Sequence, residues 1–142
     1  METAAMDDAA KELRRHAGRC HCGAVRFSVL APTEVVVHQC NCSLCARTGF
    51  LHLIVPASRF TLEQGAEALT EYRWNTGVAR HLFCRICGVK AFYVPRSNPD
   101  GYSVDVRSLA RAGFRKVTIE PFDGQRWEAS AAALAGLSRD PA

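Results

Sequence analysis

The seven cysteines of this 142-residue chain lie in three short clusters. The first is a Cys-x-Cys pair, the second is a Cys-x-Cys-x-x-Cys triplet, and the third is a Cys-x-x-Cys pair. In order along the chain they are Cys20 and Cys22; Cys40, Cys42 and Cys45; and Cys84 and Cys87. Loops this short can turn neighbouring sulfurs toward one point, as a metal ion requires of its ligands. The clusters therefore predict metal binding.

The clusters divide into one closed and one open metal site. The two pairs supply four thiolates, the complete tetrahedral set of a structural zinc, whereas the triplet supplies three and leaves a fourth position free, as in catalytic zinc sites. This division uses every cysteine and predicts two zinc ions per chain. Because the two pairs are far apart in the sequence, the closed site would clamp distant strands together. Gly23 and Gly88 each follow a pair, where a residue without a Cβ lets the chain turn sharply.

Other uses of the cysteines fit the sequence less well. Neighbours in a Cys-x-Cys pair form disulfides poorly, and the first ten residues lack the apolar stretch of a signal peptide. A thioredoxin-like redox role for Cys84 and Cys87 would need a βαβ context that is missing here. Buried structural cysteines are a further alternative. Zinc is the preferred ion, because iron–sulfur proteins usually space their cysteines differently.

Composition and charge limit the remaining possibilities. Apolar residues make up 48% of the chain, enough for the core of one small domain. No apolar run approaches the roughly 20 residues of a transmembrane helix, so a reducing cytoplasm is the expected location and no membrane partner is expected. The formal charge of +4 falls to near +1 once the thiolates and zinc ions are counted. Nucleic acid is therefore not an expected partner.

Alternating apolar and polar residues predict a mainly β fold of antiparallel strands. Strands are expected at residues 25–29, 34–39, 50–56, 59–63, 70–74, 79–84, 88–94, 102–106 and 116–120. One helical turn is expected at 43–47. Residues 127–137 are Ala-rich, with Leu134 and Leu137 at helical spacing, which predicts a C-terminal helix.

The chain divides into one domain with two peripheral segments. Residues 1–17 are expected to be an N-terminal tail or short helix, because acidic residues precede basic ones along them as the helix dipole favours. Residues 18–128 are expected to form the zinc-binding β domain, and residues 129–142 a C-terminal helix and tail.

The open site suggests a substrate. Zinc on three thiolates carries a charge near −1 and is a weaker Lewis acid than zinc on three histidines. Such a site favours a soft sulfur ligand and would keep it as a thiolate. The hypothesis is a small thiol substrate that reacts at the carbon next to its sulfur. A histidine that supplied a fourth ligand, namely His38, His52 or His81, would instead close the site and make it structural.

The cysteine motifs resemble those of the glutathione-dependent formaldehyde-activating enzyme family. The matching stretches are Gly-Arg-Cys-His-Cys-Gly-Ala-Val at 18–25, Cys-Asn-Cys-Ser-Leu-Cys at 40–45 and Phe-Cys-Arg-Ile-Cys-Gly at 83–88. Residues 54–60 and the loop Pro-Arg-Ser-Asn-Pro at 95–99 are closer still to its centromere protein V branch. The resemblance covers about residues 18–128.

The resemblance implies a zinc-bound antiparallel β-tent with peripheral helices. It assigns Cys20, Cys22, Cys84 and Cys87 to a structural zinc, and it assigns Cys40, Cys42 and Cys45 to a catalytic zinc. It also implies carbon–sulfur lyase chemistry, in which formaldehyde and glutathione combine reversibly to S-hydroxymethylglutathione. This agrees with the thiol substrate inferred from ligand type.

Arg96 and Asn98, in the loop after the last zinc pair, are candidate substrate-binding residues. A guanidinium can bind a substrate carboxylate through two hydrogen bonds, although the loop can also be read as a simple Pro-braced turn. Two other readings of the whole protein stay open. One is a non-catalytic zinc-stabilised β module that binds a macromolecule, and the other is a redox or metal sensor in which Cys40 and Cys45 oxidise reversibly.

Overall fold

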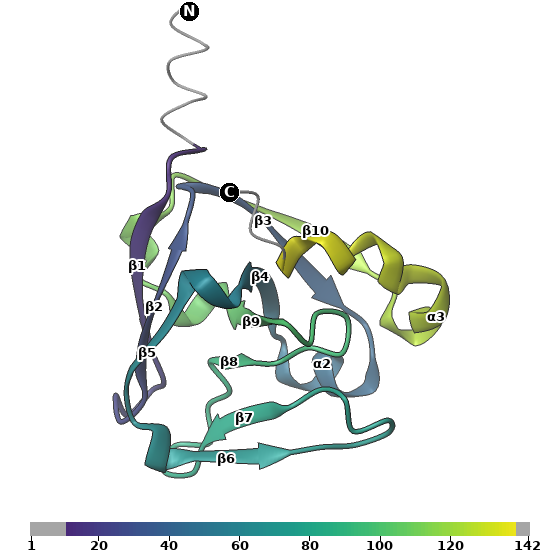
Figure 1. Cartoon of the computed structure of the whole chain (residues 1–142), viewed down its shortest axis with the longest axis horizontal. Helices are drawn as coiled ribbons and strands as arrows, with labels where there is room; N and C mark the ends of the chain where they lie inside the picture. The colour runs from purple at the N-terminus through teal and green to yellow at the C-terminus, as the bar shows by residue number, and fades with distance from the viewer. Residues whose placement is uncertain (1–10, 139–142) are drawn as a thin grey trace, which may run out of the picture.

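The computed structural model describes residues 11–138, which form ten strands and several short helices (Figure 1). The strands are β1 (Arg14–Arg19), β2 (Arg26–Ala31), β3 (Glu34–Cys40), β4 (Leu51–Pro56), β5 (Phe60–Gln64), β6 (Leu69–Tyr72), β7 (His81–Cys84), β8 (Phe92–Tyr93), β9 (Gly101–Asp105) and β10 (Lys116–Phe122). The α-helices are α2 (Ser43–Thr48) and α3 (Trp127–Ser130). The 3-10 turns are η1 (Ala57–Arg59), η2 (Ala66–Ala68), η3 (Val106–Ser108), η4 (Arg111–Gly113), η5 (Gly124–Arg126), η6 (Ala131–Ala133) and η7 (Ala135–Ser138). The predicted mainly β class is confirmed.

The strands form three sheets. One has the order β1-β2-β5, the second has the order β10-β3-β4-β9-β8, and β6 pairs with β7 in a hairpin. All strand pairs are antiparallel except β10 with β3, which run parallel. The predicted antiparallel arrangement thus has one exception, the β10–β3 pair. The connection through η3 and η4 returns the chain to the start of β3, where the backbone N–H of Arg115 donates to Thr33 O at 2.8 Å.

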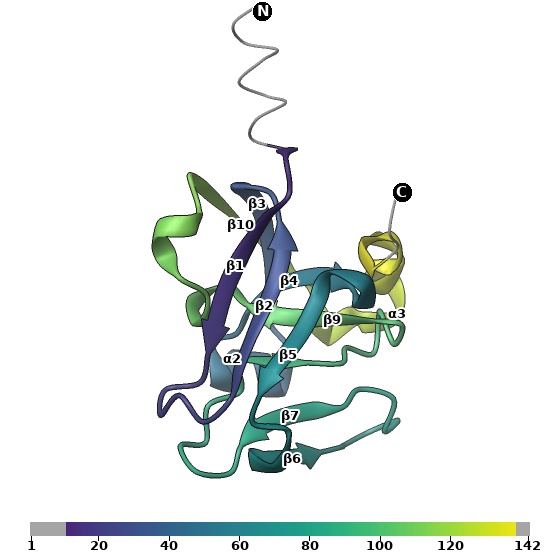
Figure 2. The same ribbon diagram turned by 60° about the vertical axis from the view of Figure 1, so that its left-hand side comes forward.

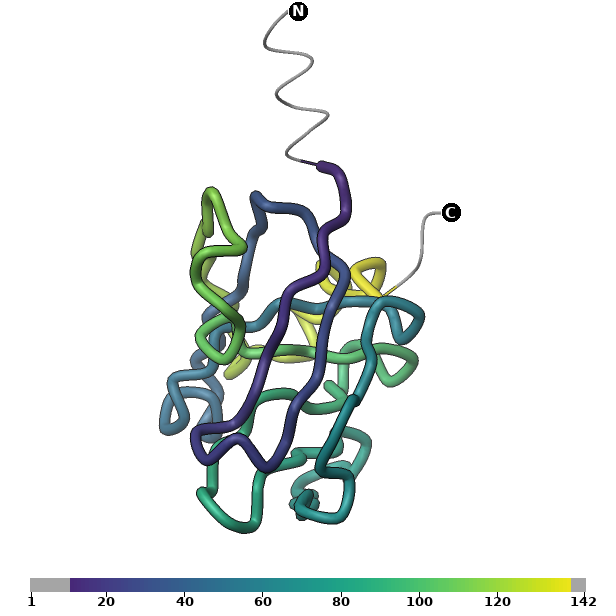
Figure 3. The backbone as a smooth tube through the Cα atoms, turned by 90° about the vertical axis from the view of Figure 1, so that its left-hand side faces the viewer, coloured from purple at the N-terminus to yellow at the C-terminus, as the bar shows by residue number. Residues whose placement is uncertain are grey.

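The core lies between the three-stranded and five-stranded sheets. Strands β1, β2 and β5 run across β4 and β9 of the other sheet (Figures 2 and 3). Phe27 of β2 is 1% exposed and meets Phe92 of β8 edge-on, with 5.1 Å between ring centroids. Phe60 of β5 stacks on Tyr102 of β9 at 4.1 Å. Rings from both sheets thus fix the position of the strands that carry the cysteine loops.

The N-terminal part of the domain begins earlier than the sequence indicates. β1 starts at Arg14 and pairs with β2 along its whole length, so the expectation of a tail or short helix through residue 17 is wrong for residues 14–17. From Arg15 to Arg19 the residues of β1 alternate between exposed and buried, and His16 is 2% exposed and stacks on Phe114 at 4.2 Å. In the sequence, the consecutive basic residues Arg14 and Arg15 obscure this alternation. Residues 1–10 lie outside the described part of the chain.

The C-terminal segment is a series of short turns in place of one helix. α3 is followed by η6 and η7, and the last turn ends at Ser138. Leu134, 6% exposed, fixes this segment to the domain. Residues 139–142 lie outside the described residues. No helix among residues 11–138 is long and apolar enough to cross a membrane.

Candidate functional site: two cysteine groups and a pocket

Four cysteines from distant parts of the chain meet at one point. Cys20 and Cys22 lie in the loop between β1 and β2, Cys84 ends β7, and Cys87 follows it. The sulfur of Cys22 lies 3.7 Å from the sulfurs of Cys20 and Cys84, and all four sulfurs lie within 4.8 Å of one another. Four ligands at about 2.3 Å around a tetrahedral zinc would be roughly 3.8 Å apart. The donor type and the spacing of this quartet therefore fit a zinc ion.

Two glycines let the quartet loops turn. Gly23 and Gly88 have φ of 80° and 76°, in the left-handed region that a residue without a Cβ adopts at little cost. Gly23 donates its N–H to Cys20 O at 3.3 Å, and Gly88 donates to Cys84 O at 2.7 Å. The backbone N–H of Val25 points at the Cys20 sulfur at 3.4 Å, as is common around ligating sulfurs. Both glycine positions are as the sequence predicts.

The other three cysteines lie together at the start of α2. Cys40 ends β3, Cys42 caps the N-terminus of α2, and Cys45 lies in its first turn. Their sulfurs are within 4.8 Å of one another. The backbone N–H of Cys42 donates to the Cys40 sulfur at 3.5 Å, and that of Cys45 donates to the Cys42 sulfur at 3.4 Å. This trio therefore places three potential ligands on six consecutive residues.

In the absence of a cation, ionisation of one trio sulfur opposes ionisation of the other two. Hydrogen bonds from Cys40 and Cys45 lower the pKa of Cys42 to about 2, whereas hydrogen bonding within the trio raises the pKa of Cys40 and of Cys45. One sulfur is then ionised at the expense of the other two, because like charges this close repel. A divalent cation would remove the conflict by neutralising the thiolates. The electrostatics of the trio thus fit a metal site.

The loop after β10 covers one side of the trio. A Cβ built on Gly124 would lie 2.3 Å from the Cys40 sulfur, so the loop can approach this closely only with glycine there. Asn41 holds the loop, since its side-chain oxygen accepts from the Gln125 N–H and its amide donates to Asp123, both at 3.0 Å. No local sequence pattern places this loop at the trio. Its Asp-Gly turn signal is present, but only the parallel β3–β10 pairing brings it to the cysteines.

His52 is the histidine nearest to the trio. It is 5% exposed, and its Nε2 lies 3.3 Å from the Cys45 sulfur. Its Nδ1 lies 3.0 Å from the Ser103 hydroxyl and 3.1 Å from the Tyr93 hydroxyl. Burial, followed by the charge of Lys90, lowers the pKa of His52 to about 3, so its ring is neutral at pH 7. In the tautomer in which Nδ1 accepts from a hydroxyl, Nε2 carries the proton and points it toward the Cys45 sulfur.

The three candidate histidine ligands have different surroundings. Within the described chain, the group whose donor atoms all lie within 4.8 Å of one another contains the three cysteines and no histidine. His38 faces Glu120 at 3.7 Å, and His81 contacts Lys90 at 2.8 Å. The geometry thus gives the trio three mutually close protein donors, with His52 beside one of them.

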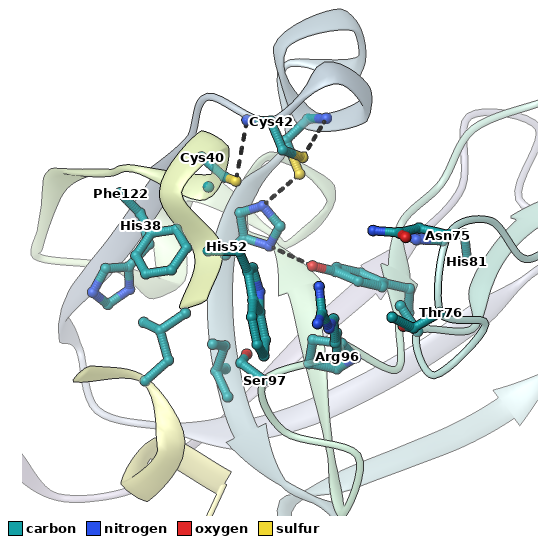
Figure 4. A pocket seen from close by; sticks show the side chains of 18 of the residues that line it. His38, Cys40, Cys42, His52, Asn75, Thr76, His81, Arg96, Ser97 and Phe122 are labelled. Atoms are coloured by element: carbon teal, nitrogen blue, oxygen red, sulfur yellow. Dashed lines mark hydrogen bonds between the residues drawn. The ribbon is translucent and has the colours of Figure 1, made fainter. Parts of the chain in front are cut away.

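The trio opens on a pocket with a volume of about 250 Å³. Figure 4 shows Cys40 and Cys42 at one end of the pocket, with His52 beneath them and Arg96 and Ser97 farther away. The aromatic walls include Trp74, Tyr93, Phe122 and Trp127, and polar side chains come from Asn75, Thr76 and Gln125. The quartet does not line this pocket. The two cysteine groups therefore differ in their access to small molecules.

The two predicted substrate-binding residues, Arg96 and Asn98, have different surroundings. Arg96 lines the pocket, its guanidinium lies 3.7 Å from the centroid of the Trp127 ring, and it donates to Glu128 at 3.0 Å. Asn98 is 1% exposed and donates to Leu134 O at 2.8 Å and to the Ser138 hydroxyl at 3.0 Å. Its amide is used to hold the C-terminal segment. Asn98 is thus a structural residue behind the pocket, and the expected substrate contact is corrected.

Comparison with known proteins agrees with the motifs. The sequence model of the glutathione-dependent formaldehyde-activating enzymes matches residues 15–126. A putative glutathione-dependent formaldehyde-activating enzyme of Halomonas elongata is 52% identical over 31 residues, which are 22% of this chain and 20% of that protein. A crystal structure of a Rhodobacter sphaeroides protein has a TM-score of 0.63 and 36% identity, and the match covers 73% of this chain and 99% of that one.

The fold and the two cysteine groups define a mainly β protein with cysteine clusters that could hold metal ions. Because the family match spans most of the chain, the protein belongs to the glutathione-dependent formaldehyde-activating enzyme family.

Proposed function

We propose that this protein is a zinc-dependent carbon–sulfur lyase acting on a small thiol adduct similar to S-hydroxymethylglutathione. The observation that carries the proposal is the convergence of Cys40, Cys42 and Cys45 at one end of a pocket. Family membership supports the substrate class, since the family is named for glutathione and formaldehyde. The proposal includes two zinc ions per chain, one on the quartet and one on the trio. The seven free cysteines suit a reducing compartment such as the cytoplasm.

The reaction divides the adduct into a thiol and an aldehyde. The carbon–sulfur bond breaks, the sulfur keeps the electron pair as a thiolate, the hydroxyl loses its proton, and the carbon–oxygen bond becomes the carbonyl of formaldehyde. The reverse direction joins the same parts. Zinc bound by the trio would supply stabilisation of the leaving thiolate. The backbone N–H groups of Cys42 and Cys45 and the His52 ring hold the trio sulfurs in place.

Arg96 is the proposed anchor for the rest of the substrate. Its guanidinium lines the same pocket as the trio and is oriented by the Trp127 ring beneath it. A guanidinium binds a carboxylate with charge-assisted hydrogen bonds. Replacing Arg96 with Met should raise KM for glutathione about tenfold with little change in kcat, since loss of one such bond costs roughly 1.5 kcal/mol or more. The same variant should leave KM for 2-mercaptoethanol, which has no carboxylate, unchanged.

The lyase proposal is tested by exchange spectroscopy. Formaldehyde and glutathione also combine without catalyst, and NMR exchange peaks report how fast the adduct and its parts interconvert. Zinc-loaded protein should accelerate the exchange in proportion to its concentration, and Cys42→Ser should remove the acceleration. An exchange rate that is independent of added protein, with glutathione and with other small thiols, would contradict the proposal.

The approach of His52 to Cys45 favours a second candidate, a non-catalytic zinc-stabilised module. If His52 Nε2 turned onto the metal, the trio site would be closed by four protein ligands. Cobalt substitution separates the two cases. Addition of a thiol should change the visible spectrum of an open trio site, whereas a closed site should keep its spectrum.

A further inference from the structure

His81 lies on another wall of the same pocket, in a fixed orientation. It is the first residue of β7, is 7% exposed and lines the pocket. Its ring stacks on the Tyr93 ring with 4.9 Å between centroids and 12° between planes. The stacking fixes the plane of the imidazole. The two ring nitrogens of His81 are therefore held in defined directions.

Lys90 forms a hydrogen bond with one of these nitrogens, Nδ1, from the side facing the inside of the domain. Its Nζ lies 2.8 Å from His81 Nδ1, 3.9 Å from the centroid of the Tyr93 ring and 5.0 Å from that of Phe50. An ammonium group on an aromatic face gains cation–π attraction, which helps to keep the charge in this half-buried place. Lys90 does not line the pocket itself. It lies behind His81.

The chemistry of this contact determines where His81 carries its proton. An ammonium has donors only, so Lys90 donates and Nδ1 of His81 accepts. A ring that accepts at Nδ1 is neutral and carries its single proton on Nε2. Burial, followed by the charge of Lys90, lowers the pKa of His81 to about 4, which agrees with a neutral ring at pH 7. Among the described residues, no hydrogen-bond partner of His81 Nε2 is seen.

The pocket that receives this N–H suits an oxygen acceptor. Its lining, taken over the described residues, includes Arg96 and no aspartate or glutamate. Lys90 adds a second positive charge just behind the wall formed by His81. In Figure 4, His81 lies beside Asn75, at a different part of the pocket from Arg96 and Ser97. A substrate with two separate oxygen groups would meet a donor at each place.

We propose that His81 is a second substrate anchor, which donates its Nε2–H to a carboxylate or amide carbonyl oxygen of the thiol substrate, and that Lys90 is the positioning residue that fixes this tautomer. The inference rests on the proposed function for the identity of the ligand. It narrows the substrate class to thiols that carry two spaced acceptor groups, one for Arg96 and one for His81, as a peptide thiol does. A thiol without such groups would lack both contacts.

The anchor is tested with S-methylglutathione, a probe whose sulfur cannot become a thiolate. Calorimetry on the zinc-loaded protein should show binding, and His81→Leu should raise Kd about tenfold, as loss of one hydrogen bond of about 1.4 kcal/mol requires. His81→Gln should restore most of the affinity, because its side-chain amide N–H replaces the Nε2–H. Equal Kd values for the wild type and His81→Leu would overturn the proposal, as would no binding by the wild type.

The positioning role of Lys90 has a spectroscopic signature that does not depend on activity. Nitrogen-15 NMR of the wild type should show His81 protonated at Nε2 and not at Nδ1. Lys90→Met should lose this preference, and Lys90→Gln, which keeps a donor without the charge, should retain it. Lys116→Met, at an exposed lysine of β10, is the matched control. A proton on Nδ1 in the wild type would overturn the tautomer. Absence of lyase activity with these results intact would count against the proposed function alone.

Discussion

The quartet and the trio present the same potential donor atom, a cysteine sulfur, in opposite surroundings. The quartet joins two loops that are separated by most of the β structure, and its Cys20 and Cys84 are each 1% exposed. The trio comes from one short stretch and opens on a pocket. A metal on the quartet would connect distant segments, whereas a metal on the trio would connect only residues that the chain already holds together. The span of the ligands along the chain, more than their chemistry, distinguishes a clamp from a reaction site.

The most severe test of this contrast removes a quartet ligand. Cys84→Ala should abolish cooperative folding, because structural zinc contributes roughly 10 kcal/mol in small zinc domains, as much as the whole stability of many proteins. Circular dichroism melts and the zinc content of the purified protein provide the measurement. A variant that melts like the wild type would show that the sheets hold the fold without this clamp.

Removing a trio ligand should separate function from folding. Cys42→Ala is expected to bind one zinc ion fewer per chain. Its exchange rate should fall roughly 100-fold or more, because losing a residue that merely hydrogen-bonds to a metal ligand already costs up to 100-fold. Its Tm should stay within a few degrees of the wild type, because α2 and β3 are joined locally. Metal analysis, melting and exchange NMR are measured on one sample. A collapse of Tm similar to that of Cys84→Ala would break the contrast between the two groups.

A substitution in the covering loop, outside the trio itself, should have a smaller effect on metal binding. Gly124→Ala places a Cβ at 2.3 Å from the Cys40 sulfur, so the loop must move away. We expect zinc affinity at the trio to fall about tenfold, since overpacking of this kind typically costs 1–3 kcal/mol. Gly136→Ala, where a Cβ meets nothing within 4 Å, is the matched control. Competition with a zinc chelator gives the two affinities. Equal values in both variants would show that the loop moves freely.

The smallest effect concerns the buried charge near the trio. Burial lowers the pKa of Lys90 from its usual 10.5 to about 8. Between these values the unfolded chain binds more protons than the folded one, so this group makes the free energy of unfolding rise with pH, by at most about 1.4 kcal/mol per pH unit. Below pH 8 Lys90 is charged in both the folded and the unfolded chain, so the full cost of burying its charge lowers the free energy of unfolding. The charged or titratable groups acting on Lys90 are His81, Asp105, Cys40, Cys42 and Cys45.

Denaturant unfolding of the wild type, Lys90→Met and Lys116→Met between pH 8 and 10 measures this rise. Lys90→Met should show a shallower slope than the other two proteins, because it lacks the group that loses a proton in the folded state. If the free energy of unfolding rose equally with pH in all three proteins, Lys90 would titrate as a solvated lysine. The electrostatic difference between the trio and the quartet would then be smaller than the structure indicates.

Much of this could be read from the sequence because cysteine spacing is a local signal. The division into quartet and trio, the glycine turns at Gly23 and Gly88 and the mainly β class depend on neighbours in the chain. Arg96, predicted from its loop to bind substrate, lines the pocket, and its role stays a prediction. The strand 88–94 shrinks to Phe92–Tyr93 because Cys84 and Val89 close a turn there, with the Cys84 N–H donating to Val89 O at 3.0 Å.

The missed features all depend on contacts between distant segments. β1 was missed because Arg14 and Arg15 conceal its period of two. Asn98 was misassigned because its partners lie in the C-terminal turns, which no local pattern connects to the loop. The parallel pairing of β10, which brings Gly124 to Cys40, depends on the path of the chain through η3 and η4.

The covering loop follows the last quartet cysteine along the sequence, and this order has a consequence for biosynthesis. The last quartet cysteine is Cys87, whereas the pocket wall includes Phe122, Gly124 and Trp127. A ribosome therefore completes the clamp well before it has made the residues that enclose the trio. The four quartet cysteines can therefore meet while the trio is still uncovered, and the trio becomes enclosed only once residues 122–127 join the fold.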